Sequence, residues 1–371
     1  MKIGVITWFT GSNYGTNFQA IALQYYLRGQ GHEVNVINYE IPPSSKKRPF
    51  IKRLLNQPRK YLFKIGMKRY EGKIAERDEK LFNAIKNKCI LTKKINNKEE
   101  LIEVCNSFDL LICGSDQIWN PNWYDRFYFA DFDEINTKRI SYAPSMGVNS
   151  IPKKIIPEIK RSINKLSCVS VREEKAADLL APYLCERPEV VVDPTLLLTQ
   201  KEWTNIFPEK QHEAGEFILA FFLNDEKAHL FAAKKFAKEQ NCKLIIVPYK
   251  GNTYFQNVDI RADAGLEEIL DLIRSARYIL TDSFHMTVFS IIYRKQFYTF
   301  QRFEENEFTS QNVRVINLLD LMNLSERLIP YQSRTIRKKK HINYDDHIKK
   351  LNLEIEKSKI FLEKAITDIS S

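Results

Sequence analysis

A histidine that follows a strand-like run is the first feature of this sequence able to do chemistry. The apolar run "YILTD" ends at Asp282, and a stretch typical of a helix begins near His285. Asp282 or Ser283 can cap that helix, whose free N–H groups and dipole attract an anion. A histidine in such a place can act as a general acid or base near neutral pH. We therefore interpret His285 as the leading acid/base candidate, and an ordinary core histidine is the alternative.

Two loops in the first half of the chain also follow strand-like runs. In "FTGSNYGTNFQA", small and turn-forming residues let backbone N–H groups approach a ligand closely. In "CGSDQIWNPNWY", Asp116 can orient or deprotonate a hydroxyl group, and aromatic rings can stack on a sugar. A tight turn and a locally packed loop are the alternatives. Besides Asp116 as a second catalytic candidate, the candidate ligand-binding residues of these loops are Asn13, Tyr14, Gly15, Ser115, Gln117, Trp119 and Asn120.

An arginine at the end of another strand-like run needs an anionic partner. Arg172 lies in "CVSVRE", and two readings of it stay open. It either clamps a carboxylate or phosphate of a substrate or forms a structural ion pair with Glu173, Glu174 or Asp193.

The elements that must position these residues alternate along most of the chain. Strand-like apolar runs are followed by helical stretches, which predicts parallel sheets covered on both faces. The polar stretch 199–216 interrupts this rhythm and is the predicted linker. We expect an α/β fold of two Rossmann-like domains facing a cleft, at 1–200 and 213–330, with a C-terminal helical tail at 331–371. Ligands of such sheets bind beyond the carboxyl ends of the strands, where these loops lie.

Composition supports a globular chain of about two domains. The sequence has 371 residues, of which 44% are hydrophobic, and its six cysteines form no CxxC pair. Neither a disulfide framework nor a metal site is expected. No apolar run approaches the length of a membrane span, and "MKIGVITWF" is typical of a first strand rather than of a signal peptide. These features predict a cytoplasmic protein.

Nearly all of the net positive charge comes from one segment. The whole chain carries +11, and residues 41–77 hold twelve basic and two acidic residues, which gives +10. Interleaved apolar residues predict an amphipathic helix pair, broken at Pro58, at the inner face of an anionic membrane. The alternative is a solvated basic helix that packs on its domain. No nucleic-acid-binding motif accompanies the charge, so nucleic acid is not an expected partner.

Taken in order, the loops resemble those of the polysaccharide pyruvyl transferase family. The matching stretches are "NYGTNFQAIALQYYL", "DLLICGSDQIWNP", "ISYAPSMG", "SVRE", "VVVDPTLLL" and "YILTDSFHMTVFSIIY", from about residue 13 to 300. The resemblance implies a glycosyltransferase-B-like fold with the acceptor on the first domain and the donor on the second. It also implies transfer of a pyruvate ketal from phosphoenolpyruvate to a sugar of a surface polysaccharide or its lipid-linked precursor, without a metal or organic cofactor.

The resemblance also implies roles for residues and shows one departure. His285 would move protons, and donor anions would meet Arg172 and the helix start at Ser283 and Phe284. Many family members resemble an Arg-Leu-His triplet where this chain has Ser283-Phe284-His285. The candidates for supplying the missing charge are Lys250, Arg294 and Arg302.

Two other functions stay open on the sequence. A fold of this kind also suits a glycosyltransferase that uses a nucleotide sugar. A non-catalytic protein that binds an anionic membrane or polymer through residues 41–77 is the other alternative.

Overall fold

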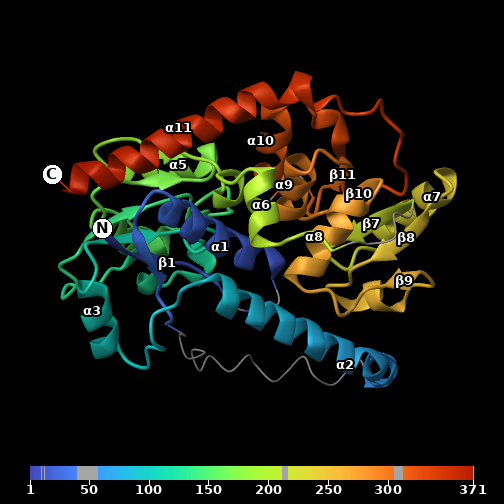
Figure 1. Ribbon diagram of the computed structural model, residues 1–371, viewed down its shortest axis with the longest axis horizontal. Coiled ribbons are helices and arrows are strands. Elements are labelled where there is room, and N and C mark those ends of the chain that lie inside the picture. Colours follow the sequence, from blue (N-terminus) through green and yellow to red (C-terminus); the bar gives the residue numbers. More distant parts are fainter. Residues whose placement is uncertain (10, 12, 40–56, 211–215, 305–311, 371) are drawn as a thin grey trace.

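Two parallel β-sheets form the frame of the molecule (Figure 1). The computed structural model describes residues 1–9, 11, 13–39, 57–210, 216–304 and 312–370. The first sheet has the order β2 (Glu33–Val36), β1 (Lys2–Ile6), β3 (Leu110–Cys113) and β4 (Lys138–Ser141). The second has the order β12 (Leu328–Ile329), β11 (Gln296–Phe300), β10 (Tyr278–Thr281), β7 (Phe217–Phe221), β8 (Lys243–Ile246) and β9 (Asp259–Ile260). A parallel pair, β5 (Ser170–Val171) and β6 (Glu189–Val190), adjoins β4 through an Ile140–Cys168 bridge.

Helices cover these sheets, as the alternating pattern predicts, and the predicted α/β fold is confirmed. We call the parts around the first and second sheets the first and second domain. The domain limits 1–200 and 213–330 stay a prediction. The first domain carries α1 (Tyr14–Gly29), α3 (Lys98–Asn106), α4 (Ile156–Ile163) and α5 (Glu174–Leu180). The second carries α7 (Lys227–Glu239), α8 (Leu266–Ser275), α9 (Phe284–Ile292) and α10 (Val313–Leu321).

Short elements complete the chain between the two domains and within the loops. The stretch predicted as a linker contains α6 (Gln200–Ile206), which starts with a capping box between Thr199 and Glu202. Single turns of 3₁₀-helix are η2 (Pro121–Trp123), η3 (Arg126–Phe129), η4 (Lys153–Ile155), η5 (Ala181–Tyr183), η6 (Pro194–Leu196), η7 (Gly251–Phe255) and η8 (Ser325–Arg327).

The two domains share one apolar core rather than merely touching. Helices α1 and α9 meet at the boundary, where the rings of Phe18 and Phe289 lie 4.5 Å apart. Trp203 of α6 packs edge-on against both rings, at 5.6 Å and 4.9 Å. All three side chains are fully buried, so this contact holds the two domains in register.

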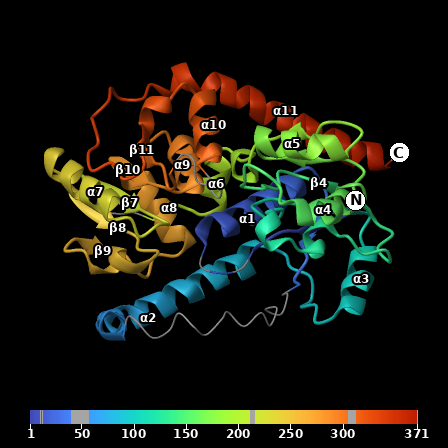
Figure 2. The same cartoon turned by 180° about the vertical axis from the view of Figure 1, so that it is seen from behind.

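Helix α2 (Gln57–Lys88) lies along both domains (Figure 2). Pro58 occupies the first turn of α2, where its missing N–H group costs nothing, and the predicted break before this helix stays a prediction. The part of the predicted helix pair at 40–56 lies outside the described residues. Leu81 packs in the core with α1, and farther along Arg77 donates to Tyr254 Oη of the second domain at 3.1 Å.

Helix α11 (Tyr344–Ser370) is the predicted C-terminal helix, and it crosses from the second domain back to the first (Figures 1 and 2). At its start, Tyr344 Oη donates to the Lys295 carbonyl at 2.6 Å. In its middle, Ser358 Oγ accepts from the Val192 amide of the first domain at 2.9 Å. The helix therefore straps the two domains together.

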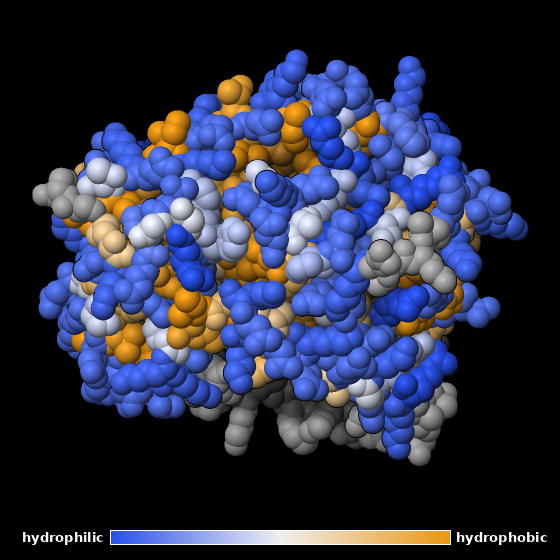
Figure 3. Space-filling model, in the orientation of Figure 1, coloured by the Kyte–Doolittle hydropathy of each residue, from blue (hydrophilic) through white to orange (hydrophobic). Residues whose placement is uncertain are grey.

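The surface view of Figure 3 shows mostly polar side chains, with apolar ones interspersed over the face drawn. Within the described residues, no helix is long and apolar enough to cross a membrane. Much of the basic segment 41–77 lies outside the described residues, so its interpretation as a membrane-binding element stays a prediction.

Candidate active site

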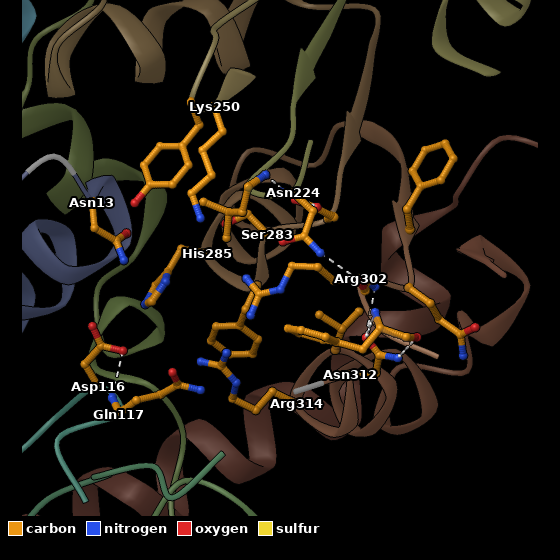
Figure 4. Close-up of a pocket in the computed structure, with 18 of the residues that line it drawn as sticks. Asn13, Asp116, Gln117, Asn224, Lys250, Ser283, His285, Arg302, Asn312 and Arg314 are labelled. Atoms are coloured by element: carbon orange, nitrogen blue, oxygen red, sulfur yellow. Dashed lines mark hydrogen bonds between the residues drawn. The ribbon is translucent and has the colours of Figure 1, made fainter. Parts of the chain in front are cut away.

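A cavity of about 390 Å³ lies between the two domains (Figure 4). On one side its walls are the loops that follow β1 and β3. On the other side they are the loops after β7, β8, β10 and β11 and the first turn of α10. The strand loops all leave carboxyl ends of parallel strands, where ligands of such sheets bind. The polar residues lining it include Asn13, Asp116, Gln117, Asn224, Lys250, Asp282, Ser283, His285, Arg302, Asn312 and Arg314.

The turn from β10 to α9 is fixed by two polar side chains. Ser283 is the N-cap, and its Oγ accepts from the Met286 amide at 3.5 Å. Asp282 faces the β7 loop instead, where its carboxylate accepts from the amides of Leu223 at 2.6 Å and Asn224 at 3.0 Å. Burial raises the pKa of Asp282 to about 6 despite these bonds. The start of α9 is thus anchored to the neighbouring strand.

His285 extends from this turn toward the first domain. Its Nε2 lies 3.4 Å from Oδ2 of Asp193. Its Nδ1 lies against Gly15 so closely that a Cβ atom there would be 2.0 Å away. The side chain lines the cavity although only 6% of the residue is exposed. His285 is therefore neither an ordinary core histidine nor a surface one, because residues of the opposite domain confine its ring.

Asp193 is a buried carboxylate held by three groups. Its Oδ1 accepts from the Thr195 amide at 2.9 Å, and its Oδ2 lies 2.9 Å from Nη2 of Arg172. Burial alone would raise the pKa of Asp193, but Arg172, His285 and Thr195 hold it well below its usual range. Asp193 is consequently ionised at any working pH.

Arg172 takes the structural role that the sequence left open. Besides its contact with Asp193, its guanidinium donates to Ser115 Oγ and lies 5.5 Å from the centre of the Phe284 ring. It is not among the described residues that line the cavity, whereas Phe284 is, and the predicted place of Arg172 on a substrate anion stays a prediction.

Asp116 presents an oriented carboxylate to the cavity from the first domain. Thr16 Oγ1 donates to its Oδ2 at 2.6 Å, and the Gln117 amide donates to its Oδ1 at 2.8 Å. Its φ of 70° lies in the left-handed region, which aspartate adopts more readily than most residues do. Asn13, the N-cap of α1, lines the same wall.

The aromatic part of this wall differs from the prediction. Trp119 is only 1% exposed and stacks on Phe129 at 4.7 Å, because the loop after β3 folds back onto its own apolar cluster. Trp8 lines the cavity instead, 6.4 Å from the half-exposed Trp123. Trp8 follows β1 directly, so the same strand-end rule would have found it.

Three other residues predicted to bind the acceptor are buried within the protein instead. Tyr14 is buried and donates through Oη to the Ala264 carbonyl at 2.5 Å. Ser115 is buried beneath the loop, and Asn120 caps η2 through the Asn122 amide at 3.0 Å. These side chains shape the loops and do not line the cavity in the part of the chain that the structure describes.

Positive charge reaches the cavity from the second domain. In Figure 4, Lys250, Arg302 and Arg314 lie on one side of His285, opposite Asn13 and Asp116. Burial lowers the pKa of Arg302, and the nearby Asp282 partly offsets this. Burial and the like charge of Arg172 lower the pKa of Arg314 to about 10. An arginine with that pKa stays charged near pH 7. Where the family pattern has an arginine in place of Ser283, this chain has Arg302 and Arg314 lining the same cavity as Ser283.

Two of these three cations were candidates from the sequence, and one was not. Arg314 stands in the first turn of α10, well beyond the end of β11 at Phe300, so no strand-end signal marks it. The candidate Arg294 lies at the far end of α9 from His285, where it pairs with Asp345 at 3.0 Å on the surface. The length of the helix keeps it away from the cavity.

The two facing domains and the crossing helix α11 define a glycosyltransferase-B-like fold. Among solved structures, UDP-GlcNAc 2-epimerase from Methanocaldococcus jannaschii has a TM-score of 0.51 and 11% identity, over 96% of this chain and 93% of that one. The enzyme of the same name from Rickettsia bellii has a TM-score of 0.50 and 12% identity, over 100% of this chain and 97% of that one. Such identities show the fold alone.

Sequence comparison gives the family. No curated protein sequence matches the chain significantly. The model of the polysaccharide pyruvyl transferase family matches residues 13–302, and the chain belongs to this family of transferases. The match begins at Asn13, at the end of the loop after β1, spans the loops after β3, β8 and β10 and reaches Arg302.

Proposed function

We propose that this chain transfers a pyruvate ketal from phosphoenolpyruvate to a sugar of a surface polysaccharide or its lipid-linked precursor. The observation that carries the proposal is the shared cavity of His285 with Lys250, Arg302 and Arg314. Phosphoenolpyruvate has a carboxylate and a phosphate beside a double bond that must be protonated. Three cations and the start of α9 suit both anions, and a histidine suits the proton transfer.

The proposed reaction balances with the groups at hand. The methylene carbon of phosphoenolpyruvate takes a proton, which leaves positive character at C2. One sugar hydroxyl adds to C2, and a second hydroxyl then takes the place of the departing phosphate. Of the two hydroxyl protons, one ends in the new methyl group and one leaves with phosphate. His285 relays protons, and the cations stabilise the charge on the leaving phosphate.

The acceptor is assigned to the first-domain wall. Asp116 presents its carboxylate there with both oxygens already oriented, as a base or hydroxyl-orienting group requires. Asn13 and Gln117 offer amide groups to further hydroxyls, and Trp8 offers an aromatic face for the sugar ring. This division puts the donor and acceptor on opposite domains with His285 between them.

The test is turnover with defined substrates. The full chain is incubated with phosphoenolpyruvate and a panel of lipid-linked and synthetic saccharides, and phosphate release and acceptor mass are measured. We expect phosphate release only with a suitable acceptor, which gains one pyruvate ketal, and loss of this activity in a folded His285→Ala variant. Consumption of a nucleotide sugar without turnover of phosphoenolpyruvate would support a glycosyltransferase instead.

Peripheral membrane association through residues 41–77 forms part of the same proposal. Neutralising Lys46, Lys47, Arg48, Lys52 and Arg53 should weaken binding to anionic vesicles while turnover of a water-soluble acceptor is kept. Vesicle binding in a chain that turns over none of the substrates would favour a non-catalytic role.

A further inference from the structure

We infer that Asp193 is the positioning residue of His285, and that it fixes the ring proton on Nε2 and leaves Nδ1 unprotonated. The inference rests on the proposed function for the reaction in which His285 moves protons. It concerns a buried contact between two domains that the cavity lining does not reveal.

The first support is the contact between two buried atoms. Nε2 of His285 and Oδ2 of Asp193 face each other at 3.4 Å, and Nε2 makes no well-directed hydrogen bond to a described group. Oδ2 also has Nη2 of Arg172 at 2.9 Å. A buried polar atom without a hydrogen bond is costly, so Asp193 is the natural partner of Nε2. The separation is longer than an ideal bond, as is common in catalytic pairs before substrate is bound.

The second support is the fixed charge of Asp193. Arg172 and Thr195 hold its carboxylate ionised, and an ionised carboxylate only accepts hydrogen bonds. A neutral histidine that faces it through Nε2 must therefore carry its proton on Nε2. The same negative charge stabilises the ring when it takes up a second proton.

The third support lies on the other edge of the ring. Nδ1 rests against Gly15 in the first turn of α1, where the helix dipole disfavours an added positive charge. The Gly15 amide already donates to Oδ1 of Asn13 at 3.1 Å, so that wall offers Nδ1 no fixed bond from this group. Both edges of the ring thus favour an unprotonated Nδ1 in the resting protein.

The consequence is an acid/base unit built from two domains. His285 comes from the second domain, whereas Asp193 and Gly15 come from the first. The histidine acquires its defined proton position only while the two domains are held together. Other charged groups that line its cavity are Asp116, Lys250, Asp282, Arg302 and Arg314, and Arg172 is the charged group that contacts Asp193 itself.

The test compares two substitutions at one carboxylate. Asp193→Asn replaces the carboxylate that faces His285 by an amide. Thr195→Val removes only the hydroxyl group that donates to Oδ1 of Asp193, and the backbone amide of residue 195 still donates to that oxygen. In the full chain labelled with ¹⁵N-histidine, the resonances of His285 are assigned by their loss in His285→Gln. We expect a proton on Nε2 in the wild type and in Thr195→Val, and a proton on Nδ1 in Asp193→Asn.

Turnover gives the second readout. Asp193→Asn should lower kcat by about 10²–10⁴-fold with little change in the KM of phosphoenolpyruvate. The limb of its pH–rate profile that His285 sets should move to lower pH, and Asp193→Glu should restore part of kcat. Thr195→Val should lower the melting temperature without moving that limb.

The outcomes separate the positioning role from the proposed function. A wild-type proton on Nδ1, or an Asp193→Asn variant with an unmoved pH profile, overturns the inference and leaves the transferase activity standing. The expected proton positions without turnover of phosphoenolpyruvate would support the positioning role and contradict the substrate. A loss of melting temperature alone in both variants would make Asp193 merely structural and would also overturn the inference.

Discussion

A single methyl group added at Gly15 should disable His285 without unfolding the protein. An ideal Cβ atom at this position lies 2.0 Å from Nδ1 and 2.6 Å from Cγ of the His285 ring. Ordinary contact begins at 3.4 Å, so the ring must retreat by about 1.4 Å, the difference between the two distances. A displacement of about 1 Å at a catalytic group costs on the order of 10²-fold in rate. We therefore expect Gly15→Ala to lower kcat/KM about 100-fold.

Stability should fall only modestly. Overpacking a buried site costs about 1–3 kcal/mol, and alanine is favoured over glycine in a helix such as α1 by up to about 1 kcal/mol, which offsets part of that cost. The assay pairs acceptor-dependent phosphate release with thermal denaturation. Gly29→Ala is the matched control, because it lies in the same helix with no atom within 4 Å of its added Cβ. Gly15→Ala with wild-type kcat/KM would show that the ring is not confined as described.

Three further substitutions test other parts of the structure. His229 is buried between phenylalanine rings, and burial lowers its pKa to about 4, below the ordinary 6.5. Its contribution to stability is therefore present above pH 6.5 and lost as the pH falls toward 4. In urea unfolding, the free energy of unfolding of the wild type should fall by about 2 kcal/mol between pH 7 and pH 5 because of His229, and His229→Leu should not show this fall. An equal fall in the variant would refute this assignment. Arg302→Gln should raise the KM of phosphoenolpyruvate about 10- to 100-fold in steady-state kinetics and leave the acceptor KM unchanged, since a charge-assisted hydrogen bond contributes about 1.5–3 kcal/mol; an unchanged donor KM would place the anion elsewhere. Trp8→Ala should raise the acceptor KM several-fold, whereas Trp119→Phe should lower only the melting temperature, and the reverse pattern would contradict the assigned sugar wall.

The fold was predictable from the sequence because its signals are local. Strands of a parallel sheet are buried on both faces, so runs such as Phe217–Phe221 read as continuous apolar segments between helical ones. The courses of α2 and α11 were not predictable in the same way. Their periodicity shows that one face is buried but not which domain buries it, and both helices contact two domains.

The site was predictable where a residue directly follows a strand. Asp116 and Lys250 stand in loops after strands, His285 stands in the first turn of the helix after β10, and all three line the cavity. Trp119 meets the same rule, yet its loop folds back into an apolar cluster, which depends on contacts distant in sequence. Arg314 stands in the first turn of α10, well beyond the end of β11, and carries no local signal.

Helix α11 also sets the order in which the chain can finish folding. Its Leu351, Leu362 and Ile366 belong to the same buried cluster as Ile3 of the first strand. Domains usually fold as they leave the ribosome, the N-terminal one first. Here the first domain must wait for a helix that is synthesised after the whole second domain. Until then the apolar side chains that α11 covers stay exposed to solvent.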